Sequence, residues 1–405
     1  MARSVLGIVL AGGRGERLFP LTEKRSKPAV PFGGKYRIID FVLSNLVNSG
    51  LNAIYVLVQF RSQSLIEHLR MAWRLGGRLR RSFITVVPPQ MRISEDWYSG
   101  TADAVYQNLN LVRDFNPDLV AIFGADHIYR MDIRQMIAFH EKVRADVSVA
   151  ARPIPVEQAR GFGILEADAR GLVTGFEEKP EHPRPMPFDA AMAYSSMGNY
   201  LFNRDVLMEV LNENARHASG HDFGRDILPP LVSRAQVYAY DFLQNAVPGL
   251  QPHEEHGYWR DVGEIESFWR AQMDLLGPAA RLDLNNPQWP ILGDNYDGPP
   301  AQLLSGTVEN ALIGEGSVMA GARLVSSVLG RGVRVEPGAV IEDSVVMDFC
   351  TIGKGARLRK AIVDRFNDVP AGATIGIDPE SDRKQYRCAA ADIVVVPRGR
   401  TRFFV

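Results

Sequence analysis

Residues 5–18 read Val-Leu-Gly-Ile-Val-Leu-Ala-Gly-Gly-Arg-Gly-Glu-Arg-Leu, an aliphatic run that passes directly into a glycine-rich turn. The run has the length and the β-branched residues of a buried strand. The glycines of the turn, Gly12, Gly13 and Gly15, allow backbone N–H groups to approach a phosphate. Because ligands of α/β sheets bind beyond the carboxyl ends of the strands, this stretch predicts an α/β sheet with a phosphate site after its first strand.

Strand-like runs and amphipathic helical stretches alternate through the first two thirds of the chain. Strands are expected over residues 5–10, 53–59, 83–87, 119–123 and 147–151. Helices are expected between them, over residues 39–49, 64–75 and 104–114. Strands that are buried on both faces and separated by helices favour a mostly parallel sheet with right-handed crossovers. We therefore predict a Rossmann-like α/β domain over residues 1–275.

The last third of the chain has a different period. Prolines and asparagines interrupt every pattern over residues 276–305, which predicts a linker. Over residues 306–405, aliphatic residues then recur every six positions, as a parallel β-helix requires of the side chains that point into its triangular coil. Antiparallel hairpins, the alternative, would show a period of two. The residues expected to point inward are Leu312, Val318, Leu324, Val340, Val346, Ile352 and Leu358, and in shifted phase Val363, Val369 and Ile375.

The composition excludes several classes of protein. The 405 residues carry a net charge of −1, so nucleic-acid binding by bulk electrostatics is not expected. The chain has none of the uninterrupted runs of ~18 apolar residues that a membrane helix needs, and the N-terminal apolar run lacks a signal-peptide cleavage site. Two cysteines, Cys350 and Cys388, are too few to staple a secreted fold of this size, which favours the reducing cytoplasm.

Five cations lie on or just after the glycine turn. The turn is no Rossmann fingerprint, because Leu18 stands where the third glycine belongs, and the chain contains no P-loop motif. A basic phosphate-binding turn is one interpretation of this segment, and a solvated basic loop is the other. The cations are Arg14, Arg17, Lys24, Arg25 and Lys27.

Two acidic residues are candidates for a metal site. Asp126 comes directly after the expected strand 119–123, and Asp261 lies in the stretch Trp259-Arg260-Asp261. Two hard carboxylates together with phosphate oxygens suit Mg²⁺ better than Zn²⁺. The alternative for Asp126 is a helix cap, since Asp is common at that position.

Eight motifs occur in an order that matches one enzyme family. Together they resemble the ADP-glucose pyrophosphorylases, or glucose-1-phosphate adenylyltransferases, of bacterial glycogen synthesis. The resemblance spans nearly the whole N-terminal domain and implies that the C-terminal coil is a left-handed β-helix. The motifs are residues 11–18 with 27–30, 32–41, 97–104, 126–129, 177–180, 196–198, 221–224 and 258–263.

The resemblance implies a reaction and a set of site residues. The reaction is the Mg²⁺-dependent transfer of AMP from ATP to α-D-glucose 1-phosphate, with release of pyrophosphate. Arg14 and Lys27 would hold the pyrophosphate, and Asp126 and Asp261 the metal. The ATP side would be lined by Gly12, Gly13, Gly15, Gln90, Tyr98 and Gly100. The glucose 1-phosphate side would be lined by Tyr98, Gly163, Glu178, Lys179, Ser196, Tyr200 and Asp222.

The resemblance also implies regulation and assembly. Anionic glycolytic effectors would bind between the two domains, at Lys24, Arg25, Arg359 and Arg402, unless these are solubilising surface charges. The β-helix would serve in oligomerisation and regulation, and the assembly would be a homotetramer.

Three other functions were weighed against this one. A UTP- or GTP-dependent sugar nucleotidyltransferase and a non-catalytic regulatory subunit stay open as alternatives. An acyltransferase is not favoured, because the last histidine is His256 and that chemistry needs one within the coils.

Overall fold

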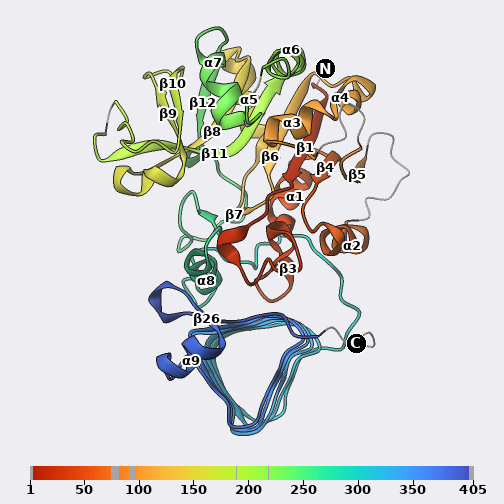
Figure 1. The fold of residues 1–405 in the computed structure, drawn as a ribbon, viewed down its shortest axis with the longest axis vertical. Coiled ribbons are helices and arrows are strands. Elements are labelled where there is room, and N and C mark those ends of the chain that lie inside the picture. Colours follow the sequence, from red (N-terminus) through yellow and green to blue (C-terminus); the bar gives the residue numbers. More distant parts are fainter. Residues whose placement is uncertain (1–2, 74–81, 91–96, 188, 218, 401–405) are drawn as a thin grey trace.

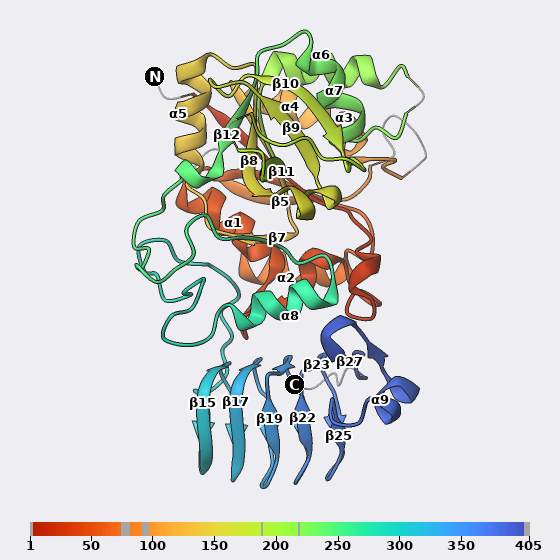
Figure 2. The ribbon, with the colours of Figure 1, turned by 90° about the vertical axis from the view of Figure 1, so that its left-hand side faces the viewer.

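The computed structural model describes residues 3–73, 82–90, 97–187, 189–217 and 219–400. A sheet flanked by helices forms the N-terminal part, and a triangular prism of short strands forms the C-terminal part (Figure 1). Helix α8 (Ile265–Met273) lies between the two (Figure 2). The predicted order of an α/β domain followed by a β-helix is confirmed.

The first half of the main sheet is parallel. Strand β1 (Val5–Ala11) lies between β4 (Ala53–Val58) and β6 (Leu119–Gly124), and β5 (Phe83–Val87) pairs with β4. All four strands lie where the sequence predicted them, within one residue at the carboxyl ends. The carboxyl ends of β1, β4 and β6 therefore meet at one edge, where the glycine turn and Asp126 follow.

The second half of the sheet is largely antiparallel. The long strand β11 (Met192–Asn203) pairs antiparallel with β6, with β8 (Val147–Pro155) and with β9 (Gly163–Ala167). Strand β10 (Val173–Glu178) pairs antiparallel with β9, and β12 (Val237–Asp241) runs parallel to β8. This half extends the sheet beyond β6, so it lies beside the acidic edge.

Helices cover both faces of the sheet. Helices α1 (Ile38–Asn48), α2 (Gln63–Ala72) and α5 (Ile133–Val143) pack on one face, and α3, α4 and α6 on the other. The single helix expected over residues 104–114 is two, α3 (Thr101–Tyr106) and α4 (Leu109–Phe115). The break falls at Asn108, whose side-chain amide donates to the Ala104 carbonyl at 2.8 Å.

The remaining elements are short or lie outside the main sheet. They are β2 (Pro31–Phe32), β3 (Tyr36–Arg37), β7 (His127–Tyr129), β13 (Trp259–Asp261), α6 (Arg204–Asn214), α7 (Leu228–Val232), α9 (Pro379–Gln385), the single turns η1 (Glu16–Leu18), η2 (Lys27–Ala29), η3 (Val156–Gly161), η5 (Phe242–Gln244) and η6 (Ala390–Asp392), and the π-turn η4 (Phe223–Ile227).

The prism begins at β14 (Gln302–Leu303), and its coils stack in parallel register. Val328 pairs with Val345, and Val345 with Ile362, so these coils take 17 residues rather than three full hexapeptides. Its other strands are β15 (Gly306–Ile313), β16 (Val318–Met319), β17 (Ala322–Leu329), β18 (Arg334–Val335), β19 (Val340–Glu342), β20 (Val345–Val346), β21 (Thr351–Ile352), β22 (Arg357–Arg359), β23 (Ala361–Val363), β24 (Asp368–Val369), β25 (Thr374–Ile375), β26 (Arg387–Cys388) and β27 (Val394–Val396).

The coil length of 17 changes which residues fill the prism. The expected inward residues from Val346 onward are buried, as is Leu324. Val318 and Val340 are only partly buried, because the following residues, Met319 and Ile341, occupy the interior instead. The prediction for Leu312 is wrong for the same reason, since its partly buried side chain packs with the cluster between the domains.

One face of the prism packs against the α/β domain. Val345 and Ile362 of β20 and β23 lie in one hydrophobic cluster with Phe268 of α8. The Trp269 indole N–H donates to the Asp343 carbonyl at 2.8 Å, at a corner of the prism. The two domains therefore share a continuous core. No helix of the described ranges has both the length and the hydropathy of a membrane span.

Candidate active site

The two acidic residues predicted for a metal site meet at the carboxyl edge of the sheet. Asp126 follows β6, and the antiparallel pair β7–β13 places Asp261 opposite His127. The Lys27 ammonium lies between them, with Nζ 3.0 Å from Asp126 Oδ2 and 2.8 Å from Asp261 Oδ1. Residues separated by more than 200 positions in sequence thus form one charged cluster.

Burial works against the charges of this cluster, and their mutual attraction outweighs it. Burial disfavours the Lys27 ammonium, but the facing carboxylates of Asp126 and Asp261 raise its pKa above the ordinary value. Burial likewise disfavours the Asp126 carboxylate, but the charge of Lys27 holds its pKa well below the ordinary range. At neutral pH the cluster therefore contains a cation and an anion in direct contact.

The cluster also has the composition of a metal site. Asp126, His127 and Asp261 each offer one ligand atom, and these atoms lie within 4.8 Å of one another. The carboxylates are hard oxygen ligands that fit a divalent cation such as Mg²⁺. His127 was missed in the sequence, although it directly follows Asp126; its ring packs on Trp259 with centroids 4.8 Å apart, and its Nδ1 is buried without a partner in the described residues.

The glycine turn lies over Lys27. Gly15 has φ +64°, and a Cβ there would lie 2.9 Å from Lys27 Cβ, so only glycine fits the turn at this point. Arg14 extends into solvent, 3.6 Å from Glu16. Arg17, to which the sequence gave no role, lies closer to the acidic pair, with Nη2 3.9 Å from Asp261 Oδ2.

The residues expected on the ATP side lie across the same edge. The Tyr98 N–H donates to Gln59 Oε1 at 2.8 Å, and Gln59 Nε2 donates back to the Tyr98 carbonyl at 3.1 Å. Gln59 also touches the turn, because a Cβ on Gly12 would lie 3.4 Å from its Cβ. Gln90 is exposed and donates to the Pro88 carbonyl. Tyr98 is thus anchored beside the glycine turn.

The residues expected on the sugar side come from the antiparallel half of the sheet. Glu178 ends β10, and a Cβ on Gly163 would lie 2.7 Å from Glu178 Oε2, so the small residue leaves room for the carboxylate. Burial raises the pKa of Glu178. Lys179, which has φ +53°, follows with Nζ 3.7 Å from Glu178 Oε1 and a half-exposed side chain.

Ser196, Tyr200 and Asp222 complete this side. Ser196 and Tyr200 flank an irregularity in β11, where its register with β8 shifts. Tyr200 is buried, and its ring lies 5.5 Å from that of Phe223, the residue after Asp222. The three residues therefore lie between the antiparallel half of the sheet and the turn η4.

The four residues expected at an effector site are not gathered in one place. Lys24 is exposed, whereas Arg25 is buried in an ion pair with Asp364 of the prism. Arg359 is exposed on β22, on a different prism face from Asp364, because the chain turns a corner at Lys360. Arg402 lies outside the described residues.

The sequence missed a cluster of arginines between the domains. Burial and the neighbouring Arg365 lower the pKa of Arg37 to about 9. Asp348 receives Arg331 and Arg365, with N to O distances of 3.4 and 3.2 Å, and its pKa is lowered because these cations outweigh burial. The cluster, named the interdomain arginine cluster below, consists of Arg25, Arg37, Arg331, Arg365 and Arg398 with Asp294, Asp348 and Asp364.

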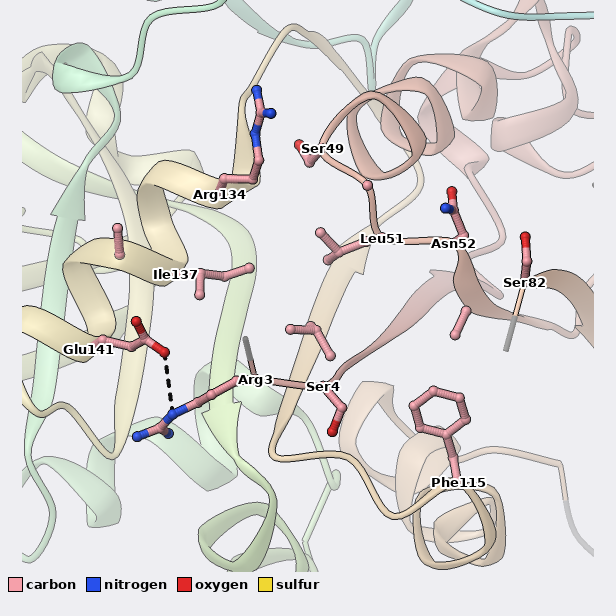
Figure 3. A pocket seen from close by; sticks show the side chains of 14 residues that line it. Arg3, Ser4, Ser49, Leu51, Asn52, Ser82, Phe115, Arg134, Ile137 and Glu141 are labelled. Atoms are coloured by element: carbon pink, nitrogen blue, oxygen red, sulfur yellow. Dashed lines mark ion pairs between the residues drawn. The ribbon is translucent and has the colours of Figure 1, made fainter. Parts of the chain in front are cut away.

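A cavity of about 690 Å³ lies at the opposite edge of the sheet, at the amino ends of β1 and β4 (Figure 3). Arg3 and Glu141 line it and pair with each other at 3.3 Å (Figure 3). The cavity is remote from the carboxyl ends that hold Asp126 and Lys27. It therefore takes no part in the site described above.

Comparison with known proteins agrees with this geometry. Residues 6–277 match the model of the nucleotidyl transferase family, and residues 299–396 match that of GlmU-like C-terminal hexapeptides. The glucose-1-phosphate adenylyltransferase of Thermodesulfovibrio yellowstonii is 50% identical over 97% of this chain and 96% of its own. This chain belongs to the glucose-1-phosphate adenylyltransferase family.

Further members of the glucose-1-phosphate adenylyltransferase family match to a similar extent. The enzyme of Photobacterium profundum is 46% identical over 98% of both chains, and that of Anaeromyxobacter sp. is 44% identical over 97% of this chain and 98% of its own. The resemblance stated from the motifs is thereby confirmed, and the chain is a nucleotidyltransferase. Nucleotidyltransferases of this family use a divalent metal ion.

Proposed function

We propose that the chain transfers AMP from ATP to α-D-glucose 1-phosphate, giving ADP-glucose and pyrophosphate for glycogen synthesis. The observation that carries this proposal is the contact of Lys27 with both Asp126 and Asp261 beside the glycine turn. One cation for phosphates and two carboxylates for a metal stand at the edge where α/β sheets bind nucleotides. A regulatory subunit without activity would have no use for this arrangement.

The chain supplies position and charge rather than a general base. The phosphate of glucose 1-phosphate is already an anion, so the attack on the α-phosphorus of ATP needs no proton removal. Lys27, with Arg14 and Arg17 from the turn, would bind the pyrophosphate that leaves. Asp126 and Asp261 would hold Mg²⁺, which when bound neutralises the charge of the phosphates.

The sugar would lie over the antiparallel half of the sheet. Lys179 is the proposed partner of the sugar phosphate, because its half-exposed ammonium lies at the end of β10. Glu178 and Asp222 offer carboxylate oxygens to sugar hydroxyls, with Ser196 and Tyr200 between them. Tyr98, anchored by Gln59, would lie between the nucleotide and the sugar.

The test is to incubate the purified protein with Mg²⁺, glucose 1-phosphate and each nucleoside triphosphate in turn, and to measure pyrophosphate. ATP is expected to give a kcat/KM at least tenfold above those of UTP and GTP. Replacing ATP by UTP at no loss would support the alternative sugar nucleotidyltransferase. No pyrophosphate with any of them would support the regulatory subunit.

The interdomain arginine cluster supports a second part of the proposal, the binding of an anionic glycolytic effector. Its five arginines face three aspartates, and Arg25 Nη1 is buried without a partner in the described residues. Such an excess of positive charge favours a phosphate or carboxylate. We place the effector at this cluster with Lys24 at its rim, rather than at Arg359.

Fructose 1,6-bisphosphate, fructose 6-phosphate, pyruvate and 3-phosphoglycerate are the effectors to screen. Lys24→Ala is expected to keep the basal rate and weaken activation, by ~5- to 100-fold in effector affinity. Arg357→Ala, an exposed arginine on another face of the prism, is the matched control. Equal activation of both variants would remove Lys24 from the effector site.

The edge of the prism supports a homotetramer. Strand β15 pairs with β17, and the described residues offer no strand to its other side. Leu303, Leu304 and Val308 are 54, 65 and 40% exposed there. An unpaired edge with exposed aliphatic side chains favours contact with a second copy. Sedimentation should give a tetramer that Val308→Lys dissociates, and a monomeric wild type would contradict the proposal.

We also propose a cytoplasmic location. Cys350 and Cys388 are both free, and burial raises the pKa of Cys350 to about 12. Free thiols of this kind are ordinary in a reducing compartment.

A further inference from the structure

The start of helix α3 is in direct backbone contact with the loop before η4. The Ala102 N–H donates to the His221 carbonyl at 2.8 Å. Gly100 comes so close that a Cβ there would lie 2.1 Å from the Gly220 carbonyl oxygen. The nucleotide-side segment 98–100 and the sugar-side loop 220–222 are therefore packed together without an intervening side chain at this point.

The Thr101 hydroxyl makes the side-chain link between these two segments. Thr101 Oγ1 donates to Asp222 Oδ2 at 2.8 Å and accepts from the Phe223 N–H at 3.0 Å. The second oxygen of Asp222, Oδ1, accepts from the N–H groups of Gly224 and Arg225 at 2.9 and 3.3 Å. The two ends of the Asp222 carboxylate are thus held by different parts of the chain.

This arrangement leaves the Asp222 carboxylate fixed but not saturated. A carboxylate has about four acceptor positions, and the protein uses three of them here. Rotation of the group would break the bond from Thr101 on one side or the two turn bonds on the other. One position of Oδ2 therefore stays available for a ligand hydroxyl in a defined direction.

We infer that Thr101 is a positioning residue that couples the nucleotide side of the site to the sugar side, by orienting Asp222. The inference rests on the proposed function, in which Asp222 accepts from the sugar. Thr101 directly follows the segment that contains Tyr98 and Gly100, so a nucleotide that orders this segment also sets the Asp222 carboxylate. Bound ATP thereby increases the affinity for glucose 1-phosphate, and the reverse holds by linkage.

The experiment compares Thr101→Val, which keeps the shape and removes the hydroxyl, with Thr101→Ser, which keeps the hydroxyl. The KM for glucose 1-phosphate is measured at low and at saturating ATP. Thr101→Val is expected to raise it by ~10-fold or more, the scale of a lost hydrogen bond to a charged group, and to abolish its dependence on ATP. Thr101→Ser should behave as the wild type.

Two further measurements keep the outcome decisive. A double variant of Thr101→Val with Asp222→Asn should be no worse than Asp222→Asn alone, because Thr101 acts through that carboxylate. Multiplied effects, or a wild-type KM in Thr101→Val, would overturn the inference. Thr101→Ala replaces Thr101→Val if the latter lowers the melting temperature. Failure of the wild type to form ADP-glucose would instead refute the proposed function.

Discussion

The acidic edge of the sheet and the interdomain arginine cluster use the same side-chain types in opposite proportions. At the edge, one lysine meets the two carboxylates of Asp126 and Asp261. Between the domains, five arginines meet three aspartates. A buried group with an excess of one sign is completed by a ligand of the other. The first site therefore suits a metal cation, and the second an anionic effector.

The largest expected effect follows from the acidic edge. Asp126→Asn keeps the size of the side chain but removes a charge that would hold Mg²⁺ and that pairs with Lys27. Turnover should fall by ~10³-fold or more, because several kcal/mol of electrostatic stabilisation are lost. The rate is measured at saturating Mg²⁺, and near-normal turnover would remove Asp126 from the metal site.

The next effect is on stability, at the arginine cluster. Asp364→Ala leaves Arg25 buried and unpaired, so the free energy of unfolding should fall by ~3–5 kcal/mol. Unfolding in urea measures it. Glu264→Ala is the matched control, since it breaks the exposed pair with Arg17. A loss no greater than that of the control would show that the cluster does not depend on this pair.

A pH effect should distinguish the cluster further. The pKa of Asp348 is depressed in the folded protein, so its contribution to stability is present above the ordinary Asp pKa of ~3.9 and is lost as the pH falls below it. Melting temperatures of the wild type and of Asp348→Asn, measured from pH 6 to pH 3, should therefore converge. A constant difference over that range would contradict the assigned charge.

The smallest expected effect concerns the glycine turn. Glu16→Ala removes the exposed ion pair with Arg14. Exposed pairs contribute ~0–1 kcal/mol, so the free energy of unfolding should hardly change. If urea unfolding showed a loss as large as that of Asp364→Ala, the exposed turn and the buried cluster would not differ as we describe.

Much of this molecule followed from local sequence pattern. The first four strands, the glycine turn and Asp126 could be predicted because a strand and the turn after it are consecutive in the chain. The period of the prism was also visible, since each hexapeptide repeats the same contact. The phase of Val318 and Val340 was not, because the coil of 17 residues depends on how the corners close.

The sequence by itself determined the α/β domain, the β-helix and the family, because these depend on periodicity and on motifs whose residues are adjacent. Only the tertiary structure decided that Lys27 lies between Asp126 and Asp261, that Arg25 is buried against Asp364, and that Thr101 bonds to Asp222. These contacts join segments separated by 99 to 339 positions. Their charges and hydrogen bonds are set by burial and distance, which exist only after the chain has folded.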